Sequence, residues 1–450
     1  MKTPIVDFVS NYLNNENAIR LHMPGHKGIM FTGPEARDIT EIAGADSLYE
    51  ADGIIRESEE LASELFGART FYSTEGSSLC IRAMLYLALV NSKSAQSGMR
   101  PWVLAGRNAH KTFLSAVGLL DLDVQWIFPK ETESYLSCKV TAEEVEQILK
   151  ASQSMPIAVY LTSPDYLGNT VDVVTIAKVC HKYGVLLLID NAHGAYLKFL
   201  ETSMHPMDLG ADMCCDSAHK TLPALTGAAY LHIAQHMPQI YAFQAKQALG
   251  LFGSTSPSYL ILQSLDAVNA YLENFYKEEI GELVSMLEEL KKELADAGYE
   301  LIADECIKIT IATKSYGYRG FEFAKLLEKE QIICEFADPD YLVLMLTPQI
   351  TTQEIERLKK TLFAIPRRSA IAEKAPHFQV QKRCLSVREA MFSESESITV
   401  ADSEGRILSN TTVGCPPAVP IVVCGEEIDK HAMECFRYYG IDHCWVVKTQ

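Results

Sequence analysis

The sequence predicts an α/β protein in which a large domain with a mostly parallel sheet precedes a smaller α+β domain. Through the first two thirds of the chain, short apolar runs alternate with longer helical patterns, which is typical of parallel strands joined by crossover helices. From about residue 291, shorter strands and helices follow one another in a mixed order. At 450 residues the chain is also too long for one ordinary domain.

The predicted elements of the large domain follow in order along the chain. Apolar runs predict strands at 101–106, 123–129, 157–164, 185–190 and 213–217. Residues 142–152 and 173–184 carry apolar side chains at helical spacing, and the second pattern closes on Gly184, as helices commonly do. Long helical patterns over 256–275 and 278–300 lead out of this region.

The small domain begins near residue 290. Strands are predicted at 306–313 and 341–347, and helices at 319–331 and 352–365. We therefore assign residues 1–290 to an N-terminal segment with the large domain and residues 291–450 to the small domain.

Composition excludes several classes of partner. The net charge is −18, from 40 Lys+Arg against 58 Asp+Glu, and no basic tract occurs, so no nucleic-acid partner is expected. An acidic enzyme could attract a cationic substrate, but on charge alone an ordinary acidic soluble protein is the favoured interpretation, since net charge bears first on solubility. The N-terminus lacks the apolar core of a signal peptide, and no apolar stretch is long enough to span a bilayer. We expect a cytoplasmic protein with no membrane partner.

The cysteine pattern favours reduced thiols. The 12 cysteines are scattered and form no C-x-x-C motif, which argues against zinc ribbons and thioredoxin-type chemistry. Cys214 and Cys215 lie within a predicted strand and are most simply core residues. His22 and His26 have the spacing of a helical zinc pair, but Pro24 and Gly25 lie between them, so no metal site is expected.

Polar residues follow two predicted strands where a parallel sheet binds ligands, beyond the carboxyl ends. The run 185–190 ends at Asp190, which Ala192 and His193 follow. The run 213–217 ends at Ser217, which precedes His219 and Lys220. A partly desolvated lysine at such a place has a lowered pKa and can act as an amine nucleophile.

A third feature is an apolar helix that begins with Gly76, Ser77 and Ser78. The free N–H groups and hydroxyls at a helix N-terminus suit a phosphate, although such a sequence alone is more often only a cap. Together, the phosphate cradle, Asp190 and Lys220 are the parts needed to hold pyridoxal phosphate, with the pyridine nitrogen on the aspartate and the aldehyde in a Schiff base with the lysine.

An ordered set of motifs carries a specific resemblance. The motifs are LHMPGHKG, DITEIAGADSLYEADGII, STEGSS, GRNAHKT, SPDYLG, DNAHGAY, DSAHKTLPALTGAAYLH and STSPSYL. In this order they resemble the ornithine/lysine/arginine decarboxylase family of fold-type-I pyridoxal-phosphate enzymes, whose large domain has the aspartate aminotransferase fold. Residues 405–427 are similar to that family's C-terminal domain, which would span roughly 375–450.

The resemblance implies a role for each matching residue. Lys220 would carry the cofactor and Asp190 would pair with the pyridinium, while Ala192 and His110 would cover the two ring faces. The further residues implied in cofactor binding are Ser77, Ser78, His193, Ser217 and His219, joined by Thr255 and Ser256 from a second subunit. A homodimer would therefore be the minimal active unit. Because the first motif begins at residue 21, with no room for the extension that assembles larger members into rings, a dimer is expected rather than a decamer.

Two positions depart from the family pattern. Asn191 stands where the family usually has glutamate, and Glu75 stands where it usually has asparagine. A negative charge beside a phosphate turn is ordinarily unfavourable, so these changes bear on substrate identity and rate. Lys111 also follows a histidine and is the better rival for the cofactor lysine, but Lys220 follows the aspartate strand and precedes a further predicted strand.

The predicted reaction is α-decarboxylation of arginine, lysine or ornithine to the amine and carbon dioxide, with Lys220 or His219 as proton donor. One alternative is aminotransfer or elimination on the same fold, for which Arg367, Arg368, Arg383 and Arg388 are available to bind a carboxylate. Another is a cofactor-binding protein without turnover, which the changes at Glu75 and Asn191 would motivate.

Overall fold

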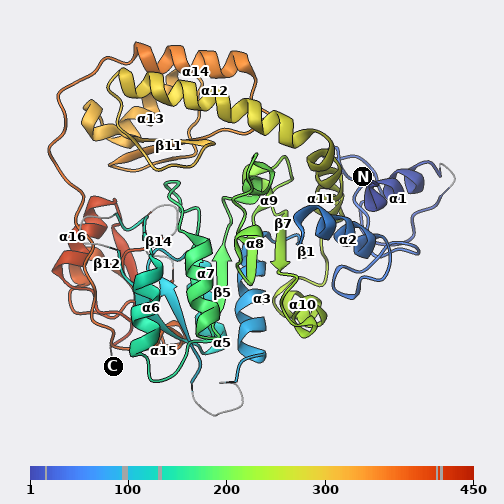
Figure 1. Ribbon diagram of the computed structural model, residues 1–450, viewed down its shortest axis with the longest axis horizontal. Helices are drawn as coiled ribbons and strands as arrows, with labels where there is room; N and C mark the ends of the chain where they lie inside the picture. The colour runs from blue at the N-terminus through green and yellow to red at the C-terminus, as the bar shows by residue number, and fades with distance from the viewer. Residues whose placement is uncertain (16–17, 94–99, 130–133, 412–413, 416–418, 450) are drawn as a thin grey trace. The chain divides into compact units, whose positions relative to one another are not determined.

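The computed structural model describes residues 1–15, 18–93, 100–129, 134–411, 414–415 and 419–449 (Figure 1). The chain divides into two compact units, each built from two separate segments. The first unit comprises Met1–Gly98 and Val173–Glu279, and the second comprises Met99–Asp172 and Ile280–Gln450. Within the described ranges, every helix is too short or too polar to cross a bilayer.

The strands of the first unit run in the order β1-β7-β6-β5. Their bounds are β1 Arg69–Ser73, β5 Leu186–Asp190, β6 Met213–Asp216 and β7 Ala229–Ile233. β5 and β6 are parallel, with Asp190 opposite Cys215, whereas β7 is antiparallel to both β6 and β1. Leu188, Ile189 and Cys214 are fully buried, as expected of parallel strands that are covered on both faces.

The helices of the first unit are α1 Pro4–Leu13, η1 Leu48–Glu50, α2 Ile54–Phe66, α3 Gly76–Val90, α7 Val173–Lys182, η2 Ala195–Phe199, α8 Pro206–Leu209, α9 Ala218–Thr221, α10 Gln239–Phe252, α11 Tyr259–Tyr271 and the π-helical turn η3 Leu272–Tyr276. α3 packs against β6 and β7, and most of its residues from Leu79 to Ala88 are buried. Its apolar composition therefore follows from burial on most sides.

The second unit contains three parallel strands and a separate small sheet. β2 Trp102–Gly106 pairs in parallel with β3 Asp123–Ile127 and β4 Ala158–Thr162. The small sheet is antiparallel and runs in the order β10-β11-β9-β8. The remaining strands are β8 Leu301–Ile302, β9 Lys308–Ala312, β10 Phe336–Ala337, β11 Tyr341–Met345, β12 Ser395–Thr399, β13 Gly414–Cys415, β14 Val419–Pro420 and β15 His443–Val447.

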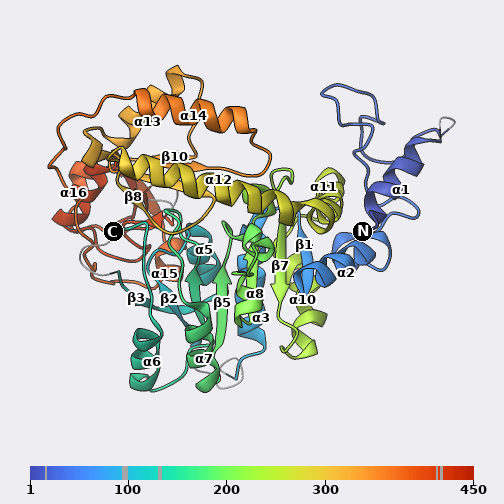
Figure 2. The same ribbon diagram turned by 45° about the horizontal axis from the view of Figure 1, so that its top comes forward.

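The helices of the second unit are α5 Lys111–Leu120, α6 Ala142–Ala151, α12 Lys277–Asp296, η4 Thr313–Tyr316, α13 Gly320–Lys329, α14 Thr352–Ala364, α15 Val387–Met391, η5 Val400–Asp402 and α16 Lys430–Tyr438. α12, α13 and α14 lie beside the small sheet (Figure 2). α6 and α14 each begin with a capping box, Thr141 with Glu144 and Thr351 with Glu354, which satisfies N–H groups at the helix starts.

One apolar cluster holds the separated segments of the second unit together. It joins Leu136 and Leu167 to Val343 of the small sheet and to Phe436 and Val446 near the C-terminus. Burial of these side chains explains why residues far apart in sequence form one compact unit. The predicted fold class, a mostly parallel α/β sheet with a smaller C-terminal part, is confirmed.

Candidate active site

Asp190 lies at the end of β5, and its side chain is 2% exposed. Its Oδ1 accepts the Ala192 N–H at 3.3 Å and the Cys215 S–H at 3.7 Å. Cys214 and Cys215 are buried free thiols, as predicted, and burial raises the pKa of both thiols well above the usual value. The carboxylate is thus held at the sheet edge where parallel folds bind ligands.

Lys220 lies in the one-turn helix α9, directly after β6. Its Nζ is 3.0 Å from Nε2 of His193, which follows β5 and is 5% exposed. The Lys220 N–H donates to the Ser217 carbonyl at 3.0 Å, which fixes the backbone that carries the amine. The structure therefore brings Lys220 and His193 together from two adjacent strand ends.

The start of α3 contacts the segment between β6 and α9 that precedes Lys220. Ser217 is 1% exposed, and its hydroxyl donates to the Ser77 hydroxyl at 2.8 Å. A Cβ placed on Gly76 would lie 3.9 Å from Cε1 of His219, so that ring also lies at the helix N-terminus. Ser78 follows in the first turn of α3. Two hydroxyls, a ring and a helix N-terminus thus converge on one place, where an anion is favoured.

Two glycines close this turn. The Gly76 N–H donates to the Gly227 carbonyl at 2.8 Å, and both residues have positive φ, +71° and +99°. A Cβ on Gly227 would lie 2.8 Å from the Thr74 carbonyl oxygen, closer than real contacts allow. Gly227 therefore permits the backbone approach that ties the start of α3 to the residues after Lys220.

His219 is held in one protonation state. Burial lowers its pKa, and its Nδ1 lies 3.0 Å from the Ala228 carbonyl, which can only accept a hydrogen. The ring is therefore neutral near pH 7, with its hydrogen on Nδ1 and a lone pair on Nε2.

Asn191 belongs to a buried polar network behind the strand ends. Its Nδ2 donates to Asp216 Oδ1 at 2.7 Å, while Asp216 Oδ2 lies 3.0 Å from Nε2 of His205 and 3.2 Å from Nε2 of His232. Although burial opposes ionisation, the two histidines hold the pKa of Asp216 well below its usual value. A carboxylate in place of Asn191 would face this buried carboxylate, which explains the amide at that position.

Glu75, the other departure from the family pattern, is the N-cap residue of α3. Its Oε1 accepts the Ser254 N–H at 2.6 Å, which ties the exposed loop 254–256 to the helix start. Thr255 and Ser256 lie in that loop, and their contribution to a second subunit stays a prediction.

His110 and Lys111 lie in the second unit. His110 is the N-cap residue of α5, and its Nδ1 accepts the Thr112 N–H at 3.2 Å. Its ring is therefore oriented with Nδ1 unprotonated. Lys111 is the first residue of α5. The stacking of His110 on the cofactor ring stays a prediction.

The four arginines considered for carboxylate binding make contacts within the second unit. Arg367 and Arg368 lie over the rings of Tyr316 and Tyr318, at 5.8 Å and 4.3 Å from the ring centroids. Arg383 pairs with Asp123 at 2.5 Å, and Arg388 donates to the Gly118 carbonyl at 2.9 Å.

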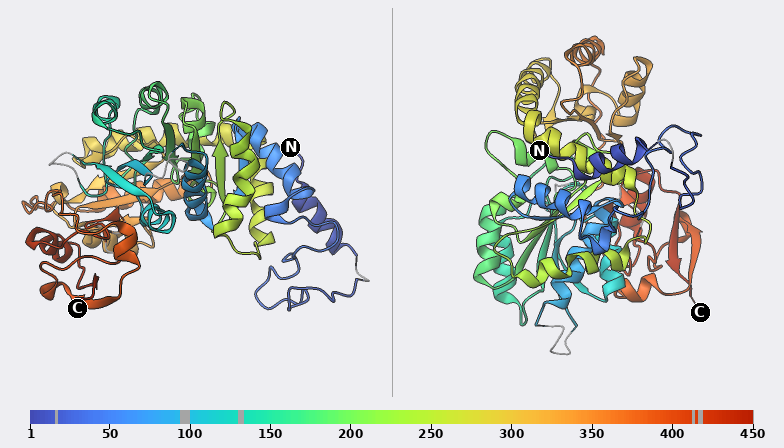
Figure 3. Two further views of the ribbon diagram at one scale, coloured as in Figure 1. Left: turned by 90° about the horizontal axis from the view of Figure 1, so that it is seen from below. Right: turned by 90° about the vertical axis from the view of Figure 1, so that its right-hand side faces the viewer.

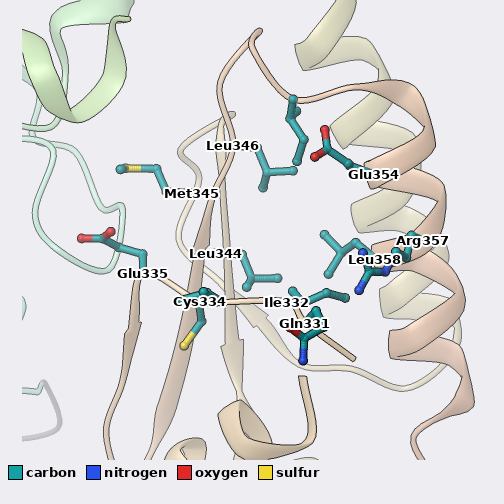
Figure 4. A pocket seen from close by; sticks show the side chains of 12 residues that line it. Gln331, Ile332, Cys334, Glu335, Leu344, Met345, Leu346, Glu354, Arg357 and Leu358 are labelled. Atoms are coloured by element: carbon teal, nitrogen blue, oxygen red, sulfur yellow. The ribbon is translucent and has the colours of Figure 1, made fainter. Parts of the chain in front are cut away.

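A cavity of about 460 Å³ lies between β11 and α14 (Figure 4). Leu344 and Leu346 line it from β11 and the residue after that strand, and Glu354, Arg357 and Leu358 line it from α14. It contains none of the residues predicted to bind the cofactor.

Sequence reasoning missed Asp216, His205, His232 and Gly227 as parts of this arrangement. Asp216 follows the buried Cys215 at a strand end, which is a usable signal for a supported carboxylate. The two histidines carry no such signal, because only the folded sheet brings them to Asp216.

Comparisons with known proteins identify the family. The profile of the Orn/Lys/Arg decarboxylase major domain matches residues 3–316, and the profile of the C-terminal domain of the same family matches residues 369–444. Several relatives are named arginine decarboxylase, and two of them show the extent of the similarity. The protein from Halalkalibacterium halodurans is 27% identical over 97% of this chain and 93% of its own length, and that from Bacillus anthracis is 28% identical over 94% and 90%.

The fold is shared with a solved structure, the constitutive lysine decarboxylase of E. coli. The TM-score is 0.78 at 18% identity, over 99% of this chain and 82% of that one. This likeness concerns the fold, which is that of fold-type-I pyridoxal-phosphate enzymes. Because the profile of the major domain matches more than half of this chain, the chain belongs to the Orn/Lys/Arg decarboxylase family.

Proposed function

We propose that this enzyme is a pyridoxal-phosphate-dependent decarboxylase of a basic amino acid, with Lys220 as the cofactor lysine. The observation that carries the proposal is that Lys220, which follows β6, contacts His193, which follows the buried Asp190 at the end of the neighbouring parallel strand β5. The names of the two relatives make arginine the first substrate to test.

The residues fit this cofactor chemically. An amine can bond to its aldehyde, a buried carboxylate can pair with its protonated ring nitrogen, and the Ser77 and Ser217 hydroxyls beside a helix N-terminus can hold its phosphate. Gly76 and Gly227 keep the phosphate turn tight, because side chains at these positive-φ positions would strain it. When bound, pyridoxal phosphate accepts the electron pair released as carbon dioxide leaves.

The protein groups divide the remaining work. Asp190 would pair with the ring nitrogen of the bound cofactor and favour its protonated form, since a buried carboxylate strongly favours a cationic partner. The network of Asn191, Asp216, His205 and His232 holds the strand end behind it. Ala192 and His193 lie two and three residues after Asp190, in the loop that follows β5. Ser78 adds a further hydroxyl in the first turn of α3, beside the proposed phosphate position.

Proton delivery to the substrate α-carbon is assigned to Lys220 rather than His219. The neutral His219 ring uses its Nδ1 hydrogen on the Ala228 carbonyl and has no hydrogen on Nε2 to give. Lys220 Nζ, 3.0 Å from His193 Nε2, can exchange protons with that ring between steps.

Decarboxylation is favoured over aminotransfer. A small-domain arginine that binds the α-carboxylate is useful to an aminotransferase, whereas a decarboxylase gains little from stabilising the group that it expels. The contacts of Arg367, Arg368, Arg383 and Arg388 with aromatic rings, a carboxylate and a carbonyl support this choice.

A homodimer is part of the proposal. The irregular segment that follows α1 lies near the N-terminal end of the ribbon (Figure 3). Between residues 19 and 31 it carries six large apolar side chains that are 63–88% exposed: Ile19, Leu21, Met23, Ile29, Met30 and Phe31. Phe243 and Leu251 of α10 are 77% and 59% exposed. Such clustered apolar exposure is typical of a surface that another chain covers, and the exposed loop 254–256 is available to a second active site.

A panel assay tests the proposal. The cofactor-loaded protein is incubated with arginine, lysine or ornithine, with and without a 2-oxo acid, and carbon dioxide is measured. Release without the 2-oxo acid from at least one substrate, absent in K220A, is the expected result. Turnover that requires the 2-oxo acid would indicate an aminotransferase, and cofactor binding without any product would indicate a protein without turnover.

A further inference from the structure

A second group of polar side chains lies at the other end of the first-unit strands. His181 in the last turn of α7 and His236 after β7 both direct Nε2 at the carboxylate of Asp212. The distances to Asp212 Oδ1 are 3.1 Å and 2.8 Å, and the two rings meet edge to face with centroids 5.6 Å apart.

Asp212 is held rigidly by its neighbours. Its N–H donates to the Leu187 carbonyl, its carbonyl accepts the Ala234 N–H, and its Oδ2 accepts the Leu187 N–H at 2.7 Å. The side chain is 3% exposed, whereas those of His181 and His236 are 43% and 53% exposed. A preorganised carboxylate therefore lies beneath two rings that border solvent.

We propose that His181, Asp212 and His236 bind one divalent transition-metal ion, with Zn²⁺ as the representative. Two imidazoles and one carboxylate are an established ligand set for such ions, at metal–ligand distances of about 2.0–2.2 Å. At a tetrahedral angle those distances separate ligand atoms by about 3.3 Å. The candidate ligand atoms already lie within 4.8 Å of one another, so small side-chain rotations complete the set. Water can fill the remaining positions, because both rings border solvent.

A cluster of the same composition, His205, Asp216 and His232, does not suit a metal. All three side chains are 0% exposed, and every ring nitrogen has a partner: Nδ1 of His232 lies 2.9 Å from the Thr70 hydroxyl, and Nδ1 of His205 accepts the Met207 N–H. Asp216 Oδ1 is taken by Asn191. That network is satisfied by hydrogen bonds and leaves no open coordination position.

The position of the surface cluster indicates a stabilising role. Asp212 directly precedes β6, whereas Ser217 and Lys220 follow that strand, so the metal would lie at the end of β6 away from the predicted cofactor lysine. An ion there would join α7, the start of β6 and the turn after β7. Its binding is therefore independent of the proposed function.

Isothermal titration of the purified full-length protein with Zn²⁺ tests the site, after the thiols are blocked so that cysteines do not compete. H181A and H236A remove one ligand each from half-exposed positions, and D212N keeps the shape of the carboxylate. H443A removes an exposed histidine outside the cluster and is the matched control. Circular dichroism checks that each variant is folded, and titration with Co²⁺ adds a visible spectrum of the bound ion.

The wild type and H443A should bind one equivalent of Zn²⁺ more than the cluster variants, or bind it at least about tenfold more tightly. Their Tm should rise with added Zn²⁺, and that rise should be smaller in H181A and H236A. Equal stoichiometry and affinity in the wild type and both histidine variants would overturn the proposal. Co²⁺ spectra that are unchanged by H181A and H236A would do the same.

Discussion

Replacing Asn191 by aspartate probes the network behind the candidate active site. Asn191 and Asp216 are both 0% exposed, and the amide Nδ2 lies 2.7 Å from Asp216 Oδ1. N191D preserves the shape of the side chain but turns the donor into a second buried carboxylate. If both groups stay ionised, like charges meet in a site already filled by two histidines.

The expected cost follows from these contacts. A hydrogen bond to a charged group stabilises by about 1.5–3 kcal/mol, and an uncompensated buried charge costs about 3–5 kcal/mol. We expect N191D to lower the free energy of unfolding by about 3–5 kcal/mol at pH 8. A protonated carboxyl could donate to Asp216 instead, so the pKa of the new group should be raised in the folded state. Its destabilisation should therefore grow as pH rises from about 4 and shrink as pH falls.

Urea unfolding at pH 5 and pH 8 measures both effects. N274D is the control, because Asn274 of η3 is exposed and, among the contacts described, its side chain donates only to the Ala270 carbonyl in the last turn of α11. That control should change stability by less than about 0.5 kcal/mol. An N191D protein within about 1 kcal/mol of the wild type at pH 8, or equally destabilised at both pH values, would refute the role assigned to the network.

Three further substitutions test other parts of the structure. Burial raises the pKa of Asp266 from 3.8 to about 6, so this group stabilises the folded state at low pH, and that stabilisation is lost as pH rises from about 4 to 6. D266N should remove about 3 kcal/mol of this pH dependence of the unfolding free energy in urea. A pH dependence equal to that of the wild type would contradict the prediction. G227A should lower stability by about 1–3 kcal/mol more than G184A, since both positions have positive φ but only Gly227 faces a clash; equal Tm values would contradict this. E75Q retains an acceptor for the Ser254 N–H and should keep the proposed dimer, whereas E75A should weaken that dimer about tenfold in sedimentation equilibrium; equal dimer affinities would contradict that role for Glu75.

Local pattern was sufficient to predict much of the fold. Runs such as 185–190 and 213–217 are apolar up to the polar residues that end them, because β5 and β6 are buried on both faces, and the structure confirms both strands. The helical pattern over 256–275 was predicted as one helix, but α11 ends at Tyr271 and the π-helical turn η3 follows. One π-helical turn is too short to alter the apparent period, since the buried residues of η3, Leu272 and Tyr276, are four positions apart, a spacing that an α-helix also gives.

The residues of the candidate site that carry a signal in the sequence are those at the ends of buried strands. Asp190 ends the buried strand β5, Ser217 directly follows β6, and Lys220 lies in the short helix after it, so position along the chain singles them out. The partners that hold them come from elsewhere: Ser77 reaches Ser217 from α3, and His232 reaches Asp216 from an antiparallel neighbour. Such contacts depend on strand order and register, which one sequence does not encode locally.

The proposed metal-binding cluster, His181, Asp212 and His236, has no signal in the sequence for the same reason. The pair that has a metal-like spacing in the sequence is His22 and His26, but in the structure His22 contacts the Tyr12 hydroxyl and His26 pairs with Asp38. His181, Asp212 and His236 are distant in sequence and meet only because β5, β6 and β7 begin or end at one edge of the sheet.

Covalent attachment of the cofactor at one lysine is the central claim, and borohydride reduction followed by peptide mapping tests it most directly. After reconstitution with pyridoxal phosphate and reduction, the mass increment of the reduced cofactor should fall on the peptide that contains Lys220 and should be absent from that peptide in K220A. An increment on Lys111 instead, or no increment in a folded protein saturated with cofactor, would contradict the account.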